Sequence, residues 1–214
     1  MTVCQKLYTQ KYMSALNTIL WPLFGYLFGS ISSAILVSKL FRLEDPRNVG
    51  SGNPGATNVL RSGNKLAAAL TLIGDVLKGV VPVLLATHYS GSITIITTVS
   101  IAAFMGHLFP VFFGFKGGKG VATAIGVFIA LSWKLFAVFA GVWILVAAVS
   151  RYSSLAGLMA AGATGLASFA IFNETHQLQL IGGVVWIVAF LFQRHRANIE
   201  RLKSGKEPKI GQKK

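Results

Sequence analysis

Long apolar segments are the feature of this chain that most limits its possible folds. Of its 214 residues, 53% are hydrophobic and only 12% are charged, whereas a soluble domain carries about 25% charged residues. A helix that crosses a bilayer needs roughly 20 apolar residues, and apolar segments of about that length recur from one end of the chain to the other. We therefore predict an all-α, polytopic integral membrane protein.

We expect seven of these segments to cross the membrane. Two of them are short and meet at Ser132-Trp133-Lys134, so they could also form one broken span. The basic residues favour seven spans, because only then do Arg151, both glycine-rich loops and the basic C-terminal tail fall on one side. The expected spans are 15–38, 65–88, 93–113, 120–133, 135–150, 154–173 and 178–193.

The positions of the basic residues also predict the orientation. The net charge is +14, and eight of the 20 Lys and Arg residues lie between Arg194 and Lys214, with most others flanking apolar segments. This is the positive-inside pattern of membrane proteins and not a basic face for nucleic acid. We expect an outside N-terminus and a single transmembrane domain over residues 1–214. A short basic cytoplasmic tail begins at about 194 and is expected to be disordered from about Pro208.

The remaining composition argues against metal sites and disulfides. Cys4 is the only cysteine, so neither an internal disulfide nor a cysteine-based metal cluster can form. The six carboxylates show no pairing typical of a two-metal site or an acid/base dyad, and we expect no metal and no cofactor. These carboxylates are Glu44, Asp45, Asp75, Glu174, Glu200 and Glu207.

The first candidate site is a glycine-rich loop that follows the first apolar segment. Its glycines, Gly52 among them, permit positive φ angles and close backbone approach, and successive backbone N–H groups in such loops can bind an anion. Several side chains add neutral hydrogen-bond donors, and Arg61 adds a forked cation. The loop therefore predicts a site for a phosphate-bearing substrate at the membrane boundary. The donors are Ser51, Asn53, Thr57 and Asn58.

A second loop, at residues 114–120, has the same character. It holds four glycines, including Gly117 and Gly118, together with Lys116 and Lys119, and Thr123 follows it. It is not a nucleotide-binding P-loop, because that motif needs glycine six residues before the lysine and Ser or Thr directly after it. Phe113 and Gly120 occupy those positions, which favours phosphate without a nucleotide.

Polar residues within the apolar segments have two interpretations. Asp75 and Lys78 are spaced i,i+3 on one helical face. Because charges inside a bilayer are usually either paired or functional, the two residues form a structural ion pair or belong to a functional site. Ser30 lies in the first span, where a hydroxyl either bonds back to the helix or serves a substrate. His107 closes the third span and is either a structural or a catalytic histidine.

The tail after the last span carries a further candidate cluster. If this segment is helical, Arg194, Asn198 and Arg201 share one face and His195 lies beside Asn198. A basic anchor on anionic lipid is the simpler interpretation, but Asn and His at this spacing favour a substrate role.

These motifs resemble those of the bacterial PlsY family, the acyl-phosphate:glycerol-3-phosphate acyltransferases. The resemblance runs from about Gly29 to Glu207. It rests on residues 50–61 with Gly29-Ser30-Ile31 and Lys39 upstream, on 106–123, on 195–202, and on 75–79 as an additional element. Two positions differ from many members, which have proline where this chain has Ser32 and an acidic residue where it has Ala197.

The resemblance implies the reaction and its setting. An acyl group passes from acyl phosphate to glycerol 3-phosphate, which yields lysophosphatidic acid and inorganic phosphate in phospholipid synthesis. The resemblance places the enzyme in the bacterial cell inner membrane, and the charge pattern then gives a periplasmic N-terminus and an active site facing the cytoplasm. Acyl-CoA and acyl carrier protein are not direct donors, and no protein partner or nucleic acid is implied.

We assign the candidate residues to two roles. The catalytic set is Ser30, Asn53, Lys119 and His195. The substrate-binding set is Arg47, Ser51, Gly52, Thr57, Asn58, Arg61, His107, Lys116, Gly117, Gly118, Thr123, Asn198 and Arg201. Acyl phosphate is already activated, so the protein mainly has to align the reactants and stabilise charge on the leaving phosphate. The proton of the acceptor hydroxyl can pass to His107, His195 or a phosphate oxygen of the donor.

Two other functions fit parts of the pattern. A membrane transporter of an organic phosphate would also use basic residues and broken helices, although no inverted repeat is visible in this sequence. A lipid-binding structural membrane protein is the second alternative. Turnover of both substrates by the purified protein separates the three.

Overall fold

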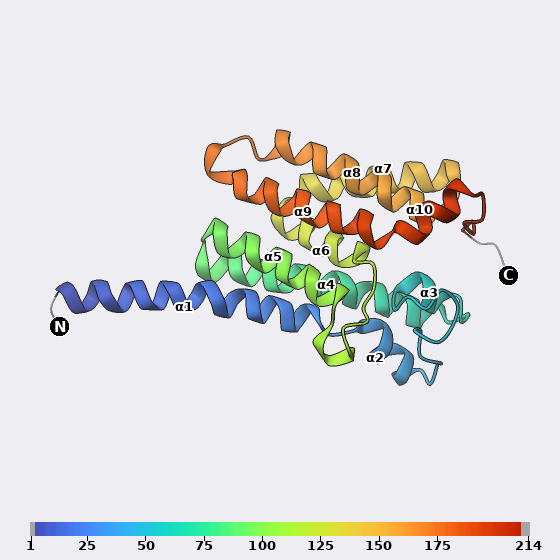
Figure 1. The fold of residues 1–214 in the computed structure, drawn as a ribbon, viewed down its shortest axis with the longest axis horizontal. Coiled ribbons are helices and arrows are strands. Elements are labelled where there is room, and N and C mark those ends of the chain that lie inside the picture. Colours follow the sequence, from blue (N-terminus) through green and yellow to red (C-terminus); the bar gives the residue numbers. More distant parts are fainter. Residues whose placement is uncertain (1–2, 211–214) are drawn as a thin grey trace.

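The computed structural model describes residues 3–210, and the side chains of residues 15–210 except His176. Within this range the chain is helical and contains no strand (Figure 1). The side chain of Cys4 and residues 211–214 of the tail lie outside the description. The elements are α1 (Val3–Gly29), α2 (Ser33–Leu40), α3 (Ala56–Leu60), α4 (Lys65–Ser90), α5 (Ile93–Leu108), η1 (Val111–Phe113), α6 (Val121–Leu131), α7 (Trp133–Ser150), α8 (Ser153–Ile171), η2 (Thr175–Gln177), α9 (Leu178–Arg194) and α10 (Arg196–Lys203).

The long helices form two groups, which are joined through α6 and through direct packing of α5 against α9. Helices α1, α4 and α5 pack together, α7, α8 and α9 form the second group, and α6 contacts both α4 and α7. Fully buried side chains from three helices, Phe104, Phe128 and Phe139, form part of the core between the groups. Helices α2, α3 and α10 gather at the end of the molecule opposite the N-terminus (Figure 1).

The prediction of an all-α membrane protein is confirmed, but the count of seven spans is not. Five helical segments are long and apolar enough to cross a membrane, and α9 with α10, bent by 56°, is a possible sixth. Helix α6 has only 11 residues, a length of about 16 Å at about 1.5 Å per residue, so it cannot cross a hydrocarbon core of about 30 Å by itself. The segments 120–133 and 135–150 are nevertheless separate helices, since α7 begins after a break at Ser132.

Two further breaks differ from the expected boundaries. The first span is not one helix, because α1 ends at Gly29 and α2 begins at Ser33. Helix α9 ends at Arg194 and α10 begins at Arg196, so residues 194–201 do not form the single helical face that the spacing predicted. The second break lies beside the second glycine-rich loop, because Arg194 donates to the carbonyls of Gly117 and Gly118.

The C-terminal tail is ordered further than the sequence predicted. The backbone N–H of Ile210 donates to the carbonyl of Arg151 at 2.7 Å, and the Arg151 guanidinium donates to the carbonyl of Ile210 at 3.2 Å. Residues 208–210 are therefore attached to the turn between α7 and α8, and the expectation of disorder from Pro208 is wrong for them.

Candidate active site

Asn58 gives the first glycine-rich loop its shape. Its side chain is buried, and Oδ1 accepts the backbone N–H of Ser51 at 2.9 Å. Its amide nitrogen donates to the carbonyls of Pro46 at 2.7 Å and Val49 at 3.0 Å. The side chain thus organises the loop from inside, a use that the sequence pattern did not predict.

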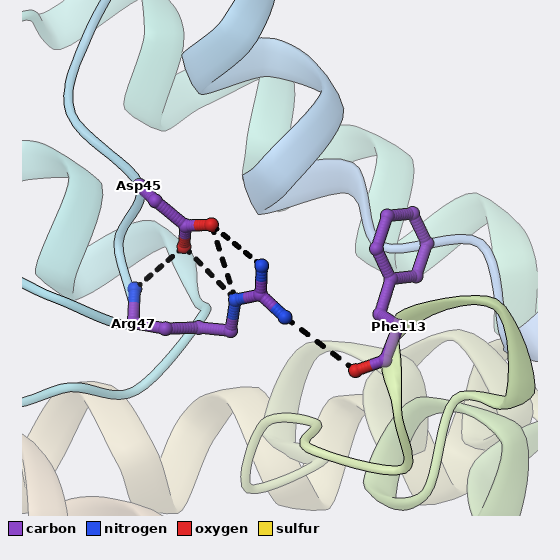
Figure 2. A network of polar contacts seen from close by, with 3 residues as sticks. All are labelled: Asp45, Arg47 and Phe113. Carbon is purple, nitrogen blue, oxygen red and sulfur yellow. Dashed lines mark hydrogen bonds and ion pairs between the residues drawn. The ribbon is translucent and has the colours of Figure 1, made fainter.

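Arg47 joins this loop to the second one (Figure 2). Its guanidinium forms a forked ion pair with Asp45, with Nη2 2.6 Å from Oδ2, and its Nη1 donates to the carbonyl of Phe113 at 3.5 Å. Phe113 ends η1, directly before the second loop. The hydrogen bonds from Arg47 lower the pKa of Asp45, so the carboxylate is ionised and fixes the direction of the guanidinium. This role of Asp45 was not predicted from the sequence.

An open pocket lies where the two loops meet. Its volume is about 270 Å³, and residues of both loops line it. The two cations of the lining are Arg47 and Lys116. Glycine backbone beside Arg and Lys side chains is suited to an anion. The lining residues are Arg47, Asn48, Gly52, Pro54, Lys116 and Gly117.

Lys119 points to a different set of partners. Its Nζ donates to Oδ1 of Asn198 at 2.6 Å, and Nδ2 of Asn198 donates to Oε1 of Glu207 at 2.6 Å. Glu207 also accepts from Ser154 at 2.6 Å and from Nε of Arg201 at 2.7 Å. Helices α8 and α10 and the tail therefore meet at the second loop, and we call these five residues the Lys119 cluster.

The charges of the Lys119 cluster are tuned by burial and by each other. Burial, with smaller contributions from the charges of Arg201, Arg61 and Arg194, lowers the pKa of Lys119 to about 8, although the charge of Glu207 opposes the shift. Burial raises the pKa of Glu207, but its hydrogen bonds from Ser154, Asn198 and Arg201 lower it overall. The cluster thus holds a Lys119 cation that gives up its proton easily beside a carboxylate that stays ionised.

The residues at the break between α9 and α10 complete the surroundings. Nδ1 of His195 lies 2.7 Å from the carbonyl of Leu191, and a carbonyl can only accept, so this nitrogen carries the proton and Nε2 keeps a lone pair in the neutral ring. Arg194 donates to the carbonyls of Gly117 and Gly118 at 3.2 Å each. Neither Arg194 nor Glu207 was assigned to the predicted site. Both nevertheless bond to residues that were, Arg194 to Gly117 and Gly118 and Glu207 to Asn198 and Arg201.

The other predicted residues divide between surface and interior. Ser51, Thr57, Arg61 and Lys116 are exposed, and Asn53 is partly exposed. Ser30, His107 and Thr123 are buried. The Ser30 hydroxyl donates to the carbonyl of Tyr26 at 2.8 Å, and that of Thr123 has no hydrogen-bond partner within the part of the chain described. Among the described residues, no three His, Cys, Asp or Glu side chains are grouped to hold a metal ion.

Comparison with known proteins identifies a single family. A family model described as glycerol-3-phosphate acyltransferase matches residues 19–205. The glycerol-3-phosphate acyltransferase of Francisella tularensis subsp. novicida is 51% identical over 191 residues, 89% of this chain and 92% of that protein. That of Francisella philomiragia is 50% identical over 190 residues, with 89% and 91% covered.

Solved structures agree with this match. The glycerol 3-phosphate form of PlsY (YgiH), an integral membrane glycerol 3-phosphate acyltransferase, superimposes with a TM-score of 0.85 at 39% identity, covering 91% of this chain and 96% of that one. Its lysophosphatidic acid form gives a TM-score of 0.83 at 37% identity, covering 91% and 95%.

Proposed function

Because this chain belongs to the glycerol-3-phosphate acyltransferase family, we propose that its acyl donor is an acyl phosphate and that its products are lysophosphatidic acid and inorganic phosphate. That the chain is a membrane acyltransferase acting on glycerol 3-phosphate follows from the family itself. The family model covers residues 19–205, which supports a single transmembrane acyltransferase domain.

The observation that carries the proposal is the presence of two cationic sites on one glycine-rich loop. Lys116 and Gly117 line the pocket with Arg47, while Lys119 lies in its own cluster with Asn198 and Glu207. Acyl phosphate and glycerol 3-phosphate each carry a phosphate, so the number of sites equals the number of phosphates. A pocket of about 270 Å³ suits a phosphate group and is far smaller than a carrier protein.

The proposed reaction needs little covalent help from the protein. The glycerol hydroxyl oxygen forms a bond to the acyl carbon, and the bond from that carbon to the phosphate oxygen breaks, so phosphate leaves with the electron pair. Lys119 stabilises the charge that develops on the leaving phosphate. Two groups can take the hydroxyl proton, namely Nε2 of His195 and a phosphate oxygen of the donor, whose second pKa is about 6. Roles for Ser30 and Asn53 remain predictions.

Turnover by the purified protein tests the donor. Reconstituted in lipid without another protein, it is expected to release phosphate only when acyl phosphate and glycerol 3-phosphate are both present. Direct attack requires both substrates bound together, so initial rates with both varied should give intersecting lines. Lysophosphatidic acid made from acyl-CoA but not from acyl phosphate would contradict the proposal. Movement of glycerol 3-phosphate across the vesicle without product would favour the transporter.

We also propose that the site faces the cytoplasm of a bacterial inner membrane, with the N-terminus on the periplasmic side. The first glycine-rich loop, α10 and the tail lie toward one end of the molecule, and the turn between α8 and α9 lies toward the other (Figure 1). Each end has an exposed residue that can be replaced by cysteine for labelling. These residues are Ser204 after α10 and Thr175 between α8 and α9.

Cysteine labelling in intact cells is expected to separate the two ends. In a Cys4→Ser background, Thr175→Cys should react with an impermeant thiol reagent after the outer membrane is permeabilised. Ser204→Cys and Lys116→Cys should react only with a permeant reagent, because the basic residues near them favour the cytoplasm. The reverse pattern would refute the orientation.

A further inference from the structure

Three ionisable side chains meet deep inside the helical bundle, outside the two cationic sites. Nζ of Lys78 lies 2.9 Å from Oδ1 of Asp75 in α4, and Nδ1 of His107 in α5 lies 3.7 Å from the same oxygen. Their side chains are only 5%, 3% and 6% exposed. Buried charges within a membrane protein are costly, and a well-packed apolar pair often replaces such an ion pair without loss of stability. Stability alone therefore gives little reason for this group.

One side chain of this group, Lys78, contacts the break between α1 and α2. Lys78 Nζ donates to the carbonyl of Ile31 at 2.9 Å. Ile31 follows Ser30 in the segment between the two helices, where a carbonyl lacks the partner that a continuous helix would supply. The lysine thus connects the ion pair to the non-helical backbone beside Ser30.

A second residue of the group, His107, contacts the second glycine-rich loop. The carbonyl of His107 accepts the backbone N–H of Gly118 at 3.2 Å, and a Cβ atom at Gly118 would collide with Nε2 of the His107 ring. Nδ1 of His107 has no hydrogen-bond partner among the described residues, and at 3.7 Å from Oδ1 of Asp75 it contacts the carboxylate without a hydrogen bond. Gly118 directly precedes Lys119, and its carbonyl accepts a hydrogen bond from Arg194 at 3.2 Å.

We propose that Asp75, Lys78 and His107 are positioning residues for acyl transfer. Asp75 orients Lys78 and His107 at the same time, and through them fixes the Ser30 break and the Gly118–Lys119 backbone relative to each other. None of the three needs to touch a substrate, which also gives His107 a role other than the substrate contact predicted from the sequence. The proposal rests on the proposed site at Lys119.

Paired substitutions separate positioning from stability. Removing one partner would leave the other charge buried alone and destabilise the fold, so both charges are removed together. Asp75→Leu with Lys78→Met replaces the ion pair by apolar side chains and deletes the donor to Ile31. Asp75→Asn with Lys78→Gln removes the same charges but keeps an amide that can donate to that carbonyl.

We expect the apolar pair variant to melt within a few degrees of the parent while its kcat falls about tenfold or more, since misalignment of reacting groups slows the chemical step. The KM for glycerol 3-phosphate should change less than kcat. The amide pair variant should recover most of the lost kcat. Thr164→Val is the matched control, because the buried hydroxyl of Thr164 bonds only to its own helix at Ala160 and its loss should leave kcat unchanged.

Two results would overturn the proposal. The first is a parental kcat in an apolar pair variant that melts like the parent, as a purely structural ion pair predicts. The second is an equal loss of kcat in both pair variants, because the donor to Ile31 would then be irrelevant. Failure of the parent protein itself to use acyl phosphate would instead count against the proposed function, so the two failures are distinguishable.

Discussion

Replacing Lys119 by methionine is expected to lower kcat/KM for acyl transfer by about 100-fold or more while the protein stays folded. A hydrogen bond to a charged group contributes about 1.5–3 kcal/mol, and loss of a donor that stabilises transition-state charge costs about 10²–10³ in rate. Methionine keeps the apolar stem, and Asn198 retains its hydrogen bond to Glu207. Phosphate release and a melting curve measure the two effects.

The matched control is Lys134→Met at the exposed start of α7. It removes the same charge away from both cationic sites and should leave kcat/KM unchanged. If Lys119→Met kept activity within about threefold of the parent, a difference worth only ~0.65 kcal/mol, Lys119 would not bind a phosphate group in the transition state.

The same lysine gives the activity a defined pH dependence. Burial lowers the pKa of Lys119 to about 8, so the cation that attracts phosphate is present below that pH and is lost above it. The pH profile of kcat/KM reports the free enzyme, and it should fall about tenfold per pH unit above about pH 8. In Lys119→Arg the decline should disappear, because a guanidinium keeps its proton, although the altered geometry lowers the maximum.

The sequence predicted the class of fold well because hydropathy is a property of each segment by itself. It did not predict the break at residues 30–32. Apolar residues precede Ser30 and follow Ser33, so the mean hydropathy over a long window hardly changes there. The 120–133 segment was predicted to be short, and what was not confirmed is its count as a full span, because α6 has only 11 residues. The polar residues Ser132 and Lys134 marked the junction with α7, but hydropathy does not show whether a short apolar helix crosses the bilayer.

Residue types suggested the candidate site, but they could not give the directions in which its side chains point. Asn58 was recognised as a donor in a loop suited to phosphate, yet its amide turns inward to Pro46 and Val49. The pairing of Lys119 with Asn198 joins residues 79 positions apart, which spacing along the chain cannot reveal. Glu207 gave one usable signal, as one of two carboxylates in a strongly basic tail, because an isolated acid among cations tends to find a partner.

The glycine at position 117 is the second residue whose replacement should nearly abolish activity. A Cβ atom there would collide with the carbonyl of His107 and come within 2.6 Å of the Leu108 carbonyl and of Cδ of Pro110. Backbone and a proline ring cannot yield as a flexible side chain does, so the loop itself must move. Gly117 lines the pocket, and its carbonyl accepts from Arg194.

We therefore expect Gly117→Ala to lower kcat/KM by at least about 100-fold, since a displacement of about 1 Å in a positioned group can cost that much. Gly141→Ala in α7 is the matched control, because no atom lies within 4 Å of the added methyl group and alanine is favoured over glycine within a helix. It should keep full activity and melt at or slightly above the parental temperature. A fully active Gly117→Ala protein would show that the loop has room to adjust, and the close packing of the 114–120 backbone on the end of α5 would then not determine the geometry of the site.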